Sequence, residues 1–282
     1  MIKNYGQRYT LTVMMWLTVF FVIPFSIILV GSFLAKGLYG GFEFSFSLDA
    51  YRALFSDTMR KVTVNTIFIS VATTIVTVAM AVPTAYYIAR SKHKDKFLFL
   101  VIIPFWTNFL IRIFAWIAIL GNNGLVNTFF ISVGLFNAPV QLLYNRWAII
   151  LIMIYTSLPF AILPLYAVIE KFDFSLLEAA RDLGATKWQS MSKILMPLII
   201  PGISTAVLFT FIPAFGNFAI PDIVGGTDVR MLGNIINEKL KTARNWPSAA
   251  AISMVLTTIS VVMVLLFNRM TASKEKKTGG KP

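Results

Sequence analysis

Long apolar runs alternate with short polar segments along the 282-residue chain. A helix that crosses a lipid bilayer needs about 20 consecutive, mostly apolar residues. Runs of this kind predict six membrane spans at Thr10–Leu34, Val62–Ala89, Phe97–Leu120, Trp147–Ile169, Leu195–Phe215 and Ala250–Asn268. The second run contains many threonines but no charged residue, and within lipid such a segment must be helical to pair its own backbone groups. The pattern therefore predicts an all-α integral membrane protein.

The first of these runs lies where a cleavable signal peptide would lie. Its apolar stretch is about 25 residues long, whereas the apolar part of a signal peptide is about 7–15 residues long. No small-residue cleavage site follows it. We therefore expect this segment to be a retained membrane anchor.

Composition agrees with the membrane class. Apolar residues make up 57% of the chain and charged residues 13%, against about 45–50% and about 25% in soluble domains. The chain has no cysteine, and its one histidine is His93. Disulfides, thiolate sites and multi-histidine metal sites are therefore excluded, and we expect no metal site.

Lysine and arginine are distributed unevenly between the predicted loops. Of the 25 cations, 15 fall in the N-terminal segment, in the loops at 90–96 and 170–194, and in the basic tail at 269–282. Nine fall in the opposite loops, and Arg112 lies inside a span. Because cytoplasmic loops carry the excess of positive charge, we predict that both termini and the loop at 170–194 are cytoplasmic.

The loop at 170–194 is too charged to lie in lipid, and its pattern predicts a helix-turn-helix. Ser175–Glu178 and Thr186–Gln189 each have the spacing of a capping box. Gly184 lies between them, where a left-handed residue would end the first helix. Helical spacing in the first helix predicts one apolar stripe made of Leu176, Leu177, Ala180 and Leu183. Such a hairpin could lie on lipid headgroups or dock onto a cytoplasmic protein.

A spaced motif in this loop favours docking. Glu178-Ala179-Ala180 is followed after three residues by Gly184 and after nine more by Ile194-x-Met196-Pro197. The arrangement resembles the EAA loop of ABC-importer permeases, in which leucine is usual at the position of Met196. Methionine and leucine have similar volumes, so this difference leaves the resemblance intact.

The resemblance implies a six-transmembrane-helix type I ABC importer permease in a bacterial cytoplasmic (inner) membrane. It implies one permease domain over 1–282, with a core at about 62–268 and the coupling loop at 170–194. The first short helix of the loop would be the coupling helix, which inserts into a groove on an ATP-binding subunit. The resemblance gives this role to Glu178, Ala179, Ala180 and Gly184, and we add the neighbouring Arg181 and Asp182.

The partners expected from the resemblance are ATP-binding cassette subunits, a second (C-type) permease and an extracytoplasmic substrate-binding protein. The chain has no G-x-x-x-x-G-K-[ST] phosphate loop. We therefore expect ATP and Mg²⁺ on the partner subunits, and no catalytic residue, cofactor or enzymatic activity in this chain. Its cations are spread among loops between spans, which favours membrane lipid over nucleic acid as their surroundings.

Further stretches narrow the resemblance. Pro104–Arg112, Gly225-Gly226 and Asn245-Trp246-Pro247 resemble the B-type permeases of spermidine/putrescine importers, over about residues 10–268. Polyamines are therefore the expected cargo. Permeases for sulfate, molybdate or ferric iron share the core, so an oxyanion or ferric iron is the alternative. A secondary transporter independent of ATP is an alternative of another class, although it would need more buried ionisable residues than Arg112.

A polyamine pathway needs carboxylates for the ammonium groups and aromatic faces for cation–π contacts. No Asp or Glu falls in the six predicted spans, so the C-type permease is expected to supply most of the carboxylates. The candidate pathway residues in this chain are Trp106, Asn108, Arg112, Phe215 and Asp222. Further aromatic candidates are Phe105, Phe114, Trp116 and Phe218.

Arg112 has two interpretations. It lies about 22 Å along its predicted helix from the cytoplasmic end, and an ionised group at such a depth usually has a function. It would attract an oxyanion and repel a polycation. We favour a structural role, in which Arg112 bonds backbone carbonyls of a kinked helix, Asn108 one turn earlier, or an acid on the partner permease. Whether the loop at 121–146 is re-entrant stays open.

Overall fold

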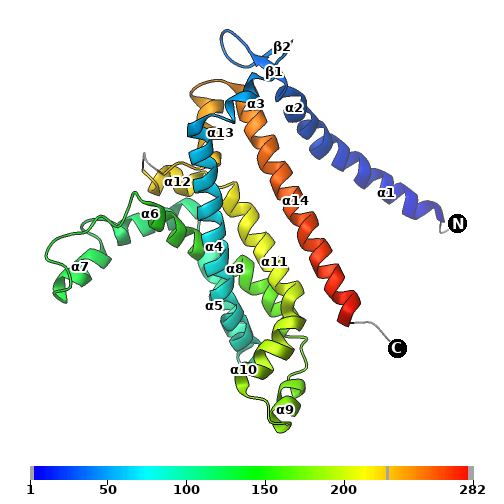
Figure 1. The fold of residues 1–282 in the computed structure, drawn as a ribbon, viewed down its shortest axis with the longest axis vertical. Coiled ribbons are helices and arrows are strands. Elements are labelled where there is room, and N and C mark those ends of the chain that lie inside the picture. Colours follow the sequence, from blue (N-terminus) through cyan, green and yellow to red (C-terminus); the bar gives the residue numbers. More distant parts are fainter. Residues whose placement is uncertain (1–2, 227–228, 279–282) are drawn as a thin grey trace. The chain divides into compact units, whose positions relative to one another are not determined.

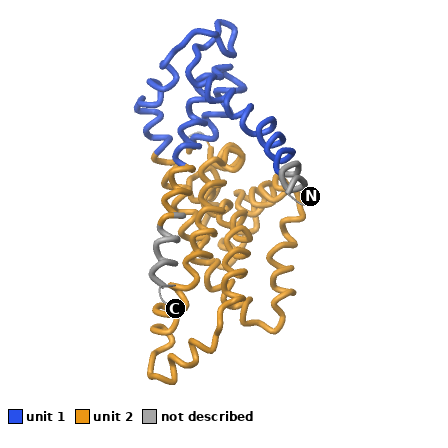
Figure 2. The backbone as a smooth tube through the Cα atoms, turned by 90° about the vertical axis from the view of Figure 1, so that its right-hand side faces the viewer, with its two compact units in different colours: residues 1–63, 232–259 blue, residues 64–231, 260–282 orange. Residues whose placement is uncertain are grey.

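The structure, a computed structural model, describes residues 3–226 and 229–278 (Figure 1). The chain forms two compact units, one made of residues 1–63 and 232–259 and the other of residues 64–231 and 260–282 (Figure 2). Helices dominate both units, which confirms the all-α class. Residues 279–282, the end of the predicted basic tail, lie outside the described residues.

Six helical segments in the described residues are long and apolar enough to cross a membrane, as the hydropathy pattern predicts. They are Thr10–Gly31, Asp57–Arg90, Phe109–Ser132, Arg146–Ile169, Lys187–Phe215 and Trp246–Phe267. Five of them coincide with predicted spans to within a few turns. The third differs, because the predicted span Phe97–Leu120 is not one helix.

The first unit consists mainly of the N-terminal helical segment and a small hairpin. Its elements are α1 (Lys3–Leu17), the π-helical turn η1 (Thr18–Val22), α2 (Ile23–Gly31), β1 (Leu34–Lys36), β2 (Phe42–Phe46), α3 (Asp49–Ala53) and α13 (Leu232–Lys241). The first turns of α4 (Asp57–Arg90) and the first half of α14 (Trp246–Thr278) also belong to it. The predicted first span ends early, because Leu34 lies in β1 rather than in a helix.

The hairpin is held by contacts with the segment before α14. Strands β1 and β2 pair antiparallel, with Lys36 opposite Phe42. The turn between them contains Gly40 and Gly41, both with positive φ, and the amide of Gly41 donates to the carbonyl oxygen of Arg244 at 3.0 Å. The ring of Phe42 packs edge-on against Trp246, with centroids 5.6 Å apart. The hydropathy pattern did not predict this hairpin.

The second unit is a helical bundle in which α11 packs along α8 (Figure 1). Its elements are the main part of α4, α5 (Lys94–Ile102), η2 (Ile103–Trp106), α6 (Phe109–Leu120), α7 (Leu125–Ser132), α8 (Arg146–Ile169), α9 (Ser175–Asp182), α10 (Lys187–Ser190), η3 (Met191–Leu195), α11 (Met196–Phe215), α12 (Ala219–Val224) and the second half of α14. Two apolar clusters form its core, and α8 contributes to both.

Several hydroxyl side chains of α4 face the interior of the bundle. The buried side chains include those of Ser70, Thr73, Thr74 and Thr77. The hydroxyl of Thr74 donates a hydrogen bond to the carbonyl oxygen of Ser70 at 2.7 Å. Thr73 contacts the sulfur of Met153 on α8. Small and hydroxylated residues let membrane helices approach closely. The many hydroxyl side chains of this span are therefore explained by its packing against the bundle.

The predicted third span is broken at Thr107 and Asn108. Helix α5 ends in the short 3₁₀ helix η2, where Pro104 occupies one of the first two positions. Thr107 then adopts an extended conformation, and Asn108 begins a new helix by accepting a hydrogen bond from the amide of Leu110 at 2.8 Å. The hydropathy pattern did not predict this break, because hydropathy does not register that an asparagine side chain can cap a new helix.

The loop at 121–146 is organised around one asparagine. Asn127 on α7 is fully buried, and its amide donates to the carbonyl oxygens of Gly121 and Val140, both at 3.0 Å. Its side-chain oxygen accepts from the amide of Val140 at 2.9 Å. Asn127 therefore ties both flanks of α7 together.

The last helix extends beyond the predicted span. Helix α14 continues to Thr278, so most of the predicted basic tail at 269–282 is helical backbone.

Candidate coupling segment and transport pathway

The loop at 170–194 forms the predicted helix-turn-helix, with α9 and α10 at one end of the bundle (Figure 1). Gly184 follows α9 with φ of +87°, a conformation that costs other residues roughly 1–2 kcal/mol. The amide of Gly184 donates to the carbonyl oxygen of Arg181 at 2.9 Å, and the amide of Ala185 donates to the carbonyl oxygen of Ala180 at 3.0 Å. This pair of bonds is a Schellman ending, so the turn is fixed by the backbone itself.

Only one of the two predicted capping boxes forms. Thr186 and Gln189 exchange both hydrogen bonds of the box at the start of α10, as predicted. The box at Ser175 is wrong, because the cap residue of α9 is Phe174 and Ser175 already lies inside the helix. The carboxylate of Asp173 accepts the amide of Ser175 at 3.0 Å instead.

Bonds from Ser175 hold the pKa of the Asp173 carboxyl below its ordinary value of 3.8. The cause is a hydrogen bond from the Ser175 hydroxyl, followed by the bond from its amide. Asp173 is therefore ionised at neutral pH and places a negative charge at the N-terminus of α9, where the helix dipole favours it.

The predicted apolar stripe of α9 is divided between two faces. Leu177 is buried in the core cluster that also contains Ile88 and Ile169. Leu176 is 46% exposed and Leu183 is 90% exposed. The expectation of one continuous stripe is therefore wrong, since a single leucine anchors the helix and the other two face outward.

The EAA residues lie on the outward surface of α9 and its turn. Glu178, Ala179, Asp182 and Gly184 are exposed, and Ala180 and Arg181 are half-buried. The Nε atom of Arg181 is buried without a hydrogen-bond partner. Trp188, on α10, is 80% exposed. The segment thus presents acidic, small and apolar side chains on its exposed surface.

An ion pair joins the first residue of α5 to the start of the loop at 170–194. The Nζ atom of Lys94 donates to Oε1 of Glu170, directly after α8. This bond lowers the pKa of Glu170 from its ordinary 4.5 and raises that of Lys94 from 10.5. The two residues are 76 positions apart, so no local pattern could have indicated the pair. For Asp173, the sequence offers one signal, which is the tendency of aspartate to accept a hydrogen bond from the amide two residues later.

Arg112 lies in a cluster of aromatic rings between η2, α6 and α8. Its guanidinium carbon is 4.3 Å from the centroid of the Phe105 ring, within cation–π range. Tyr155 of α8 stacks on Phe105 at 6.2 Å and meets Trp116 of α6 at 5.5 Å. The Nε and Nη1 atoms of Arg112 are buried and make no hydrogen bond.

The other pathway candidates are spread over three elements. Trp106 in η2 is 73% exposed, and Asn108 uses its side-chain oxygen to cap α6. The backbone amide of Arg112 bonds the carbonyl of Asn108, so these two are joined through the main chain. Phe215, at the end of α11, is 1% exposed and stacks on Phe211, so it belongs to the core. Asp222 is exposed on α12, which packs against α6 and α8.

The remaining aromatic candidates differ in their exposure. Phe105 and Trp116 belong to the Arg112 cluster. Phe114 is 57% exposed and Phe218 is 46% exposed.

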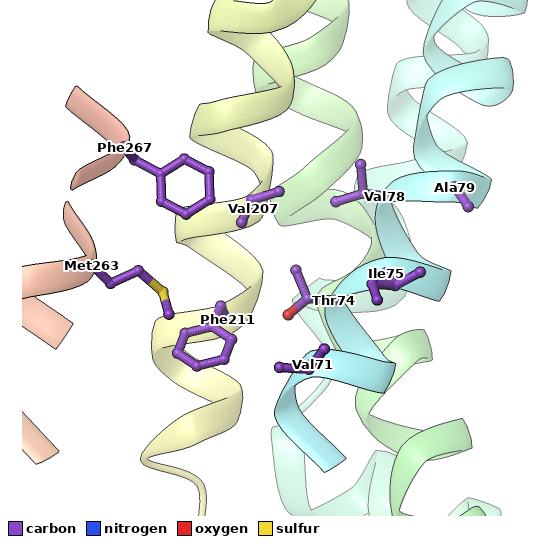
Figure 3. A pocket seen from close by; sticks show the side chains of 9 residues that line it. All are labelled: Val71, Thr74, Ile75, Val78, Ala79, Val207, Phe211, Met263 and Phe267. Carbon is purple, nitrogen blue, oxygen red and sulfur yellow. The ribbon is translucent and has the colours of Figure 1, made fainter. Parts of the chain in front are cut away.

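A separate apolar pocket lies between α4, α11 and the second half of α14 (Figure 3). Its volume is about 470 Å³. Its lining residues are Val71, Thr74, Ile75, Val78, Ala79, Val207, Phe211, Met263 and Phe267. This lining offers no charged group to an ammonium ion. Within the described residues, no group of three His, Asp or Glu side chains is placed to hold a metal ion.

Residues 62–270 match the family described as binding-protein-dependent transport system inner membrane component. The chain belongs to this family. The matched region runs from α4 into α14 and includes the whole EAA segment, whereas α1 and the hairpin lie before it. Membership confirms the resemblance drawn from the EAA motif, and it makes the chain a transport permease of the inner membrane.

Similarity to individual permeases extends over nearly the whole chain. The spermidine/putrescine transport system permease protein PotB of Haemophilus influenzae is 36% identical, over 98% of this chain and 98% of its own. PotB of Escherichia coli strain K12 is 35% identical, over 94% and 98%. A bacterial alginate ABC transporter, solved with an alginate-bound periplasmic protein, contains a chain with the same fold. Its TM-score is 0.76 at 22% identity, covering 96% of this chain and 95% of that one.

Proposed function

We propose that this permease is the transmembrane subunit of an ATP-driven polyamine importer. The observation that carries the proposal is the 36% identity to a spermidine/putrescine permease over 98% of both chains. An alignment of this length includes every span, the EAA segment and the extracytoplasmic loops. This coverage supports a common substrate class and common partners.

The coupling function is assigned to the exposed residues of α9. Glu178 and Asp182 offer carboxylates to a cation on an ATP-binding subunit, and Ala179 permits close approach. Gly184 sets the turn that presents them. ATP and Mg²⁺ would bind to the ATP-binding subunits, which supply the hydrolysis that this chain does not perform. Movement of those subunits would reach the permease through α9.

Two further partners complete the importer. A second, C-type permease would enclose the cavity and contribute carboxylates that the spans of this chain lack. An extracytoplasmic binding protein would deliver the substrate to the loops at 35–61 and 216–249. The alginate importer bound to its periplasmic protein supports such an arrangement for a permease of this fold. The excess of lysine and arginine in 90–96, 170–194 and the tail supports cytoplasmic termini.

The polyamine would pass exposed aromatic and polar side chains. Trp106 is largely exposed and offers its indole ring for a cation–π contact, and Asp222 offers a carboxylate on α12. We assign Arg112 a structural role, because its guanidinium already stacks on the ring of Phe105.

ATPase activity of the purified complex in nanodiscs tests the proposal. The complex contains its binding protein and is titrated with spermidine, putrescine, sulfate and citrate-bound ferric iron. We expect spermidine or putrescine to stimulate hydrolysis, and Trp106→Ala to weaken the stimulation. Phe129→Ala on α7, at a ring that is 60% exposed, is the matched aromatic control. Stimulation by sulfate or ferric iron alone would contradict the polyamine assignment.

One observation favours a second candidate, an oxyanion importer. Two guanidinium nitrogens of Arg112 are buried and unbonded, and an oxyanion would satisfy both. If sulfate alone stimulates hydrolysis and Arg112→Lys abolishes the effect, Arg112 becomes a substrate ligand.

A further inference from the structure

The cytoplasmic end of α4 touches the residue that begins the coupling helix. The Arg90 guanidinium lies over the ring of Phe174, 5.4 Å from its centroid, and over the ring of Tyr86, at 5.9 Å. Its Nη1 atom donates to the Tyr86 hydroxyl at 3.0 Å. The Tyr86 and Phe174 rings meet edge-to-face at 6.0 Å. Three planar groups therefore hold one another at this point.

Phe174 is well placed to control α9. It is the cap residue of α9, and its carbonyl accepts the amide of Leu177 at 3.0 Å. Leu177, three residues later, is the buried anchor of the helix. Residues three apart share one helix face, so both contacts lie on the side of α9 that meets the bundle.

The contacts of Phe174 and Leu177 together can fix the direction of α9, which a single contact cannot do. Leu177 anchors α9 in the bundle, and α9 otherwise contacts α10 and η3, which belong to its own segment of the chain. The Phe174 ring, seated between Arg90 and Tyr86, adds a second point and thereby fixes the direction of α9. Arg90 and Tyr86 belong to α4, whereas Phe172, which meets the Phe174 ring edge-to-face at 5.3 Å, belongs to the connection by which the chain reaches α9 from α8.

We propose that Arg90 and Phe174 form a joint that makes α4 follow the movement of α9. The proposal rests on the coupling function proposed above for the EAA segment. Arg90 and Phe174 act as positioning residues, since neither would contact nucleotide or substrate. Without the joint, the ATP-binding subunits would still bind α9 and hydrolyse ATP. Part of their movement would then rotate α9 without moving α4.

Substitutions at Phe174 separate coupling from folding. Phe174→Leu keeps an apolar side chain but removes the ring face, and Phe174→Tyr restores the face. Arg90→Lys keeps the charge but removes the planar group that stacks. Lys92→Ala, an exposed cation of the same loop, is the matched control. The measurement is substrate transported per ATP hydrolysed in proteoliposomes that contain the whole importer.

We expect Phe174→Leu and Arg90→Lys to lower this ratio by about fivefold or more while the complex stays assembled. Phe174→Tyr and Lys92→Ala should keep the wild-type ratio. An unchanged ratio in Phe174→Leu, or parallel losses of ATPase, transport and assembly, would overturn the proposal.

A second measurement does not need a transport substrate. Hydrogen exchange of the α9 amides in the purified permease should quicken by about tenfold or more in Phe174→Leu and stay unchanged in Phe174→Tyr. Equal exchange in wild type and Phe174→Leu would overturn the joint. A wild-type complex that responds to no polyamine would contradict the proposed function instead, and the exchange result would still decide whether α9 is held by Phe174.

Discussion

Two single residues, Gly184 and Asn127, carry the conformation of their segments. The first permits the left-handed turn between α9 and α10, and the second satisfies three backbone groups around α7. Neither role depends on apolar packing. Both can be tested by one substitution each.

At Gly184 the predicted effect comes from backbone strain alone. The space around its Cα is open, so Gly184→Ala creates no clash, but its φ of +87° costs alanine roughly 1–2 kcal/mol. We expect weaker binding of the ATP-binding subunits, measured as faster dissociation of the complex during gel filtration. Gly216→Ala is the control, because Gly216 has negative φ and only an ordinary contact. Equal behaviour of the two variants would contradict a strained turn.

At Asn127 the predicted effect comes from lost hydrogen bonds. Asn127→Ala leaves the Val140 amide and two carbonyl oxygens unpaired, and each buried unpaired group costs about 1–3 kcal/mol. We expect the Tm of the purified permease to fall by several degrees. Asn108→Ala removes one exposed cap and should cost about 1 kcal/mol, so its Tm should fall less. The reverse order of the two Tm values would be inconsistent with the buried clamp.

At the scale of elements, the ion pair between Lys94, the first residue of α5, and Glu170, directly after α8, sets a pH window. Glu170 has a lowered pKa, so its contribution is present above pH 4.5 and is lost as pH falls through the folded-state pKa. Lys94 has a raised pKa, so its contribution is present below pH 10.5 and is lost as pH rises through its folded-state value. Both side chains are partly exposed, so the contribution is small.

The Glu170→Gln variant tests this window. The difference in Tm between wild type and Glu170→Gln should stay constant between about pH 5 and 10 and shrink in stronger acid. Thermal unfolding in matched buffers measures it. A difference that varies across neutral pH would show that another titrating group governs this contact.

How far the sequence predicts these elements depends on the interaction that sets them. Apolar run length placed α8 and α14 to within a few residues at their starts, because burial in lipid dominates their formation. The break at Asn108 and the start of α9 at Ser175 depend on single side-chain bonds, accepted by Asn108 and Asp173, which compete locally with helix continuation. The hairpin at 34–46 depends on tertiary contacts with Arg244 and Trp246, which no local pattern contains.

At the scale of the whole molecule, the proposed membrane topology rests on the uneven distribution of lysine and arginine. Because the chain has no cysteine, one introduced cysteine reports one position. Trp188→Cys, 80% exposed, should react with a membrane-impermeant maleimide only from the cytoplasmic side, and Phe44→Cys, 95% exposed, only from the opposite side. Labelling of intact and lysed cells distinguishes the two sides. Reaction of both positions from one side would contradict the proposed topology.

ATP-dependent uptake of radiolabelled spermidine tests the central claim most directly. The whole importer is reconstituted in proteoliposomes with ATP inside and the substrate-loaded binding protein outside. The account predicts saturable uptake of spermidine or putrescine that requires ATP and is lost in Glu178→Lys, whose reversed charge faces the ATP-binding subunit. Uptake of sulfate or ferric iron with no polyamine uptake, or polyamine uptake that persists without ATP, would contradict it.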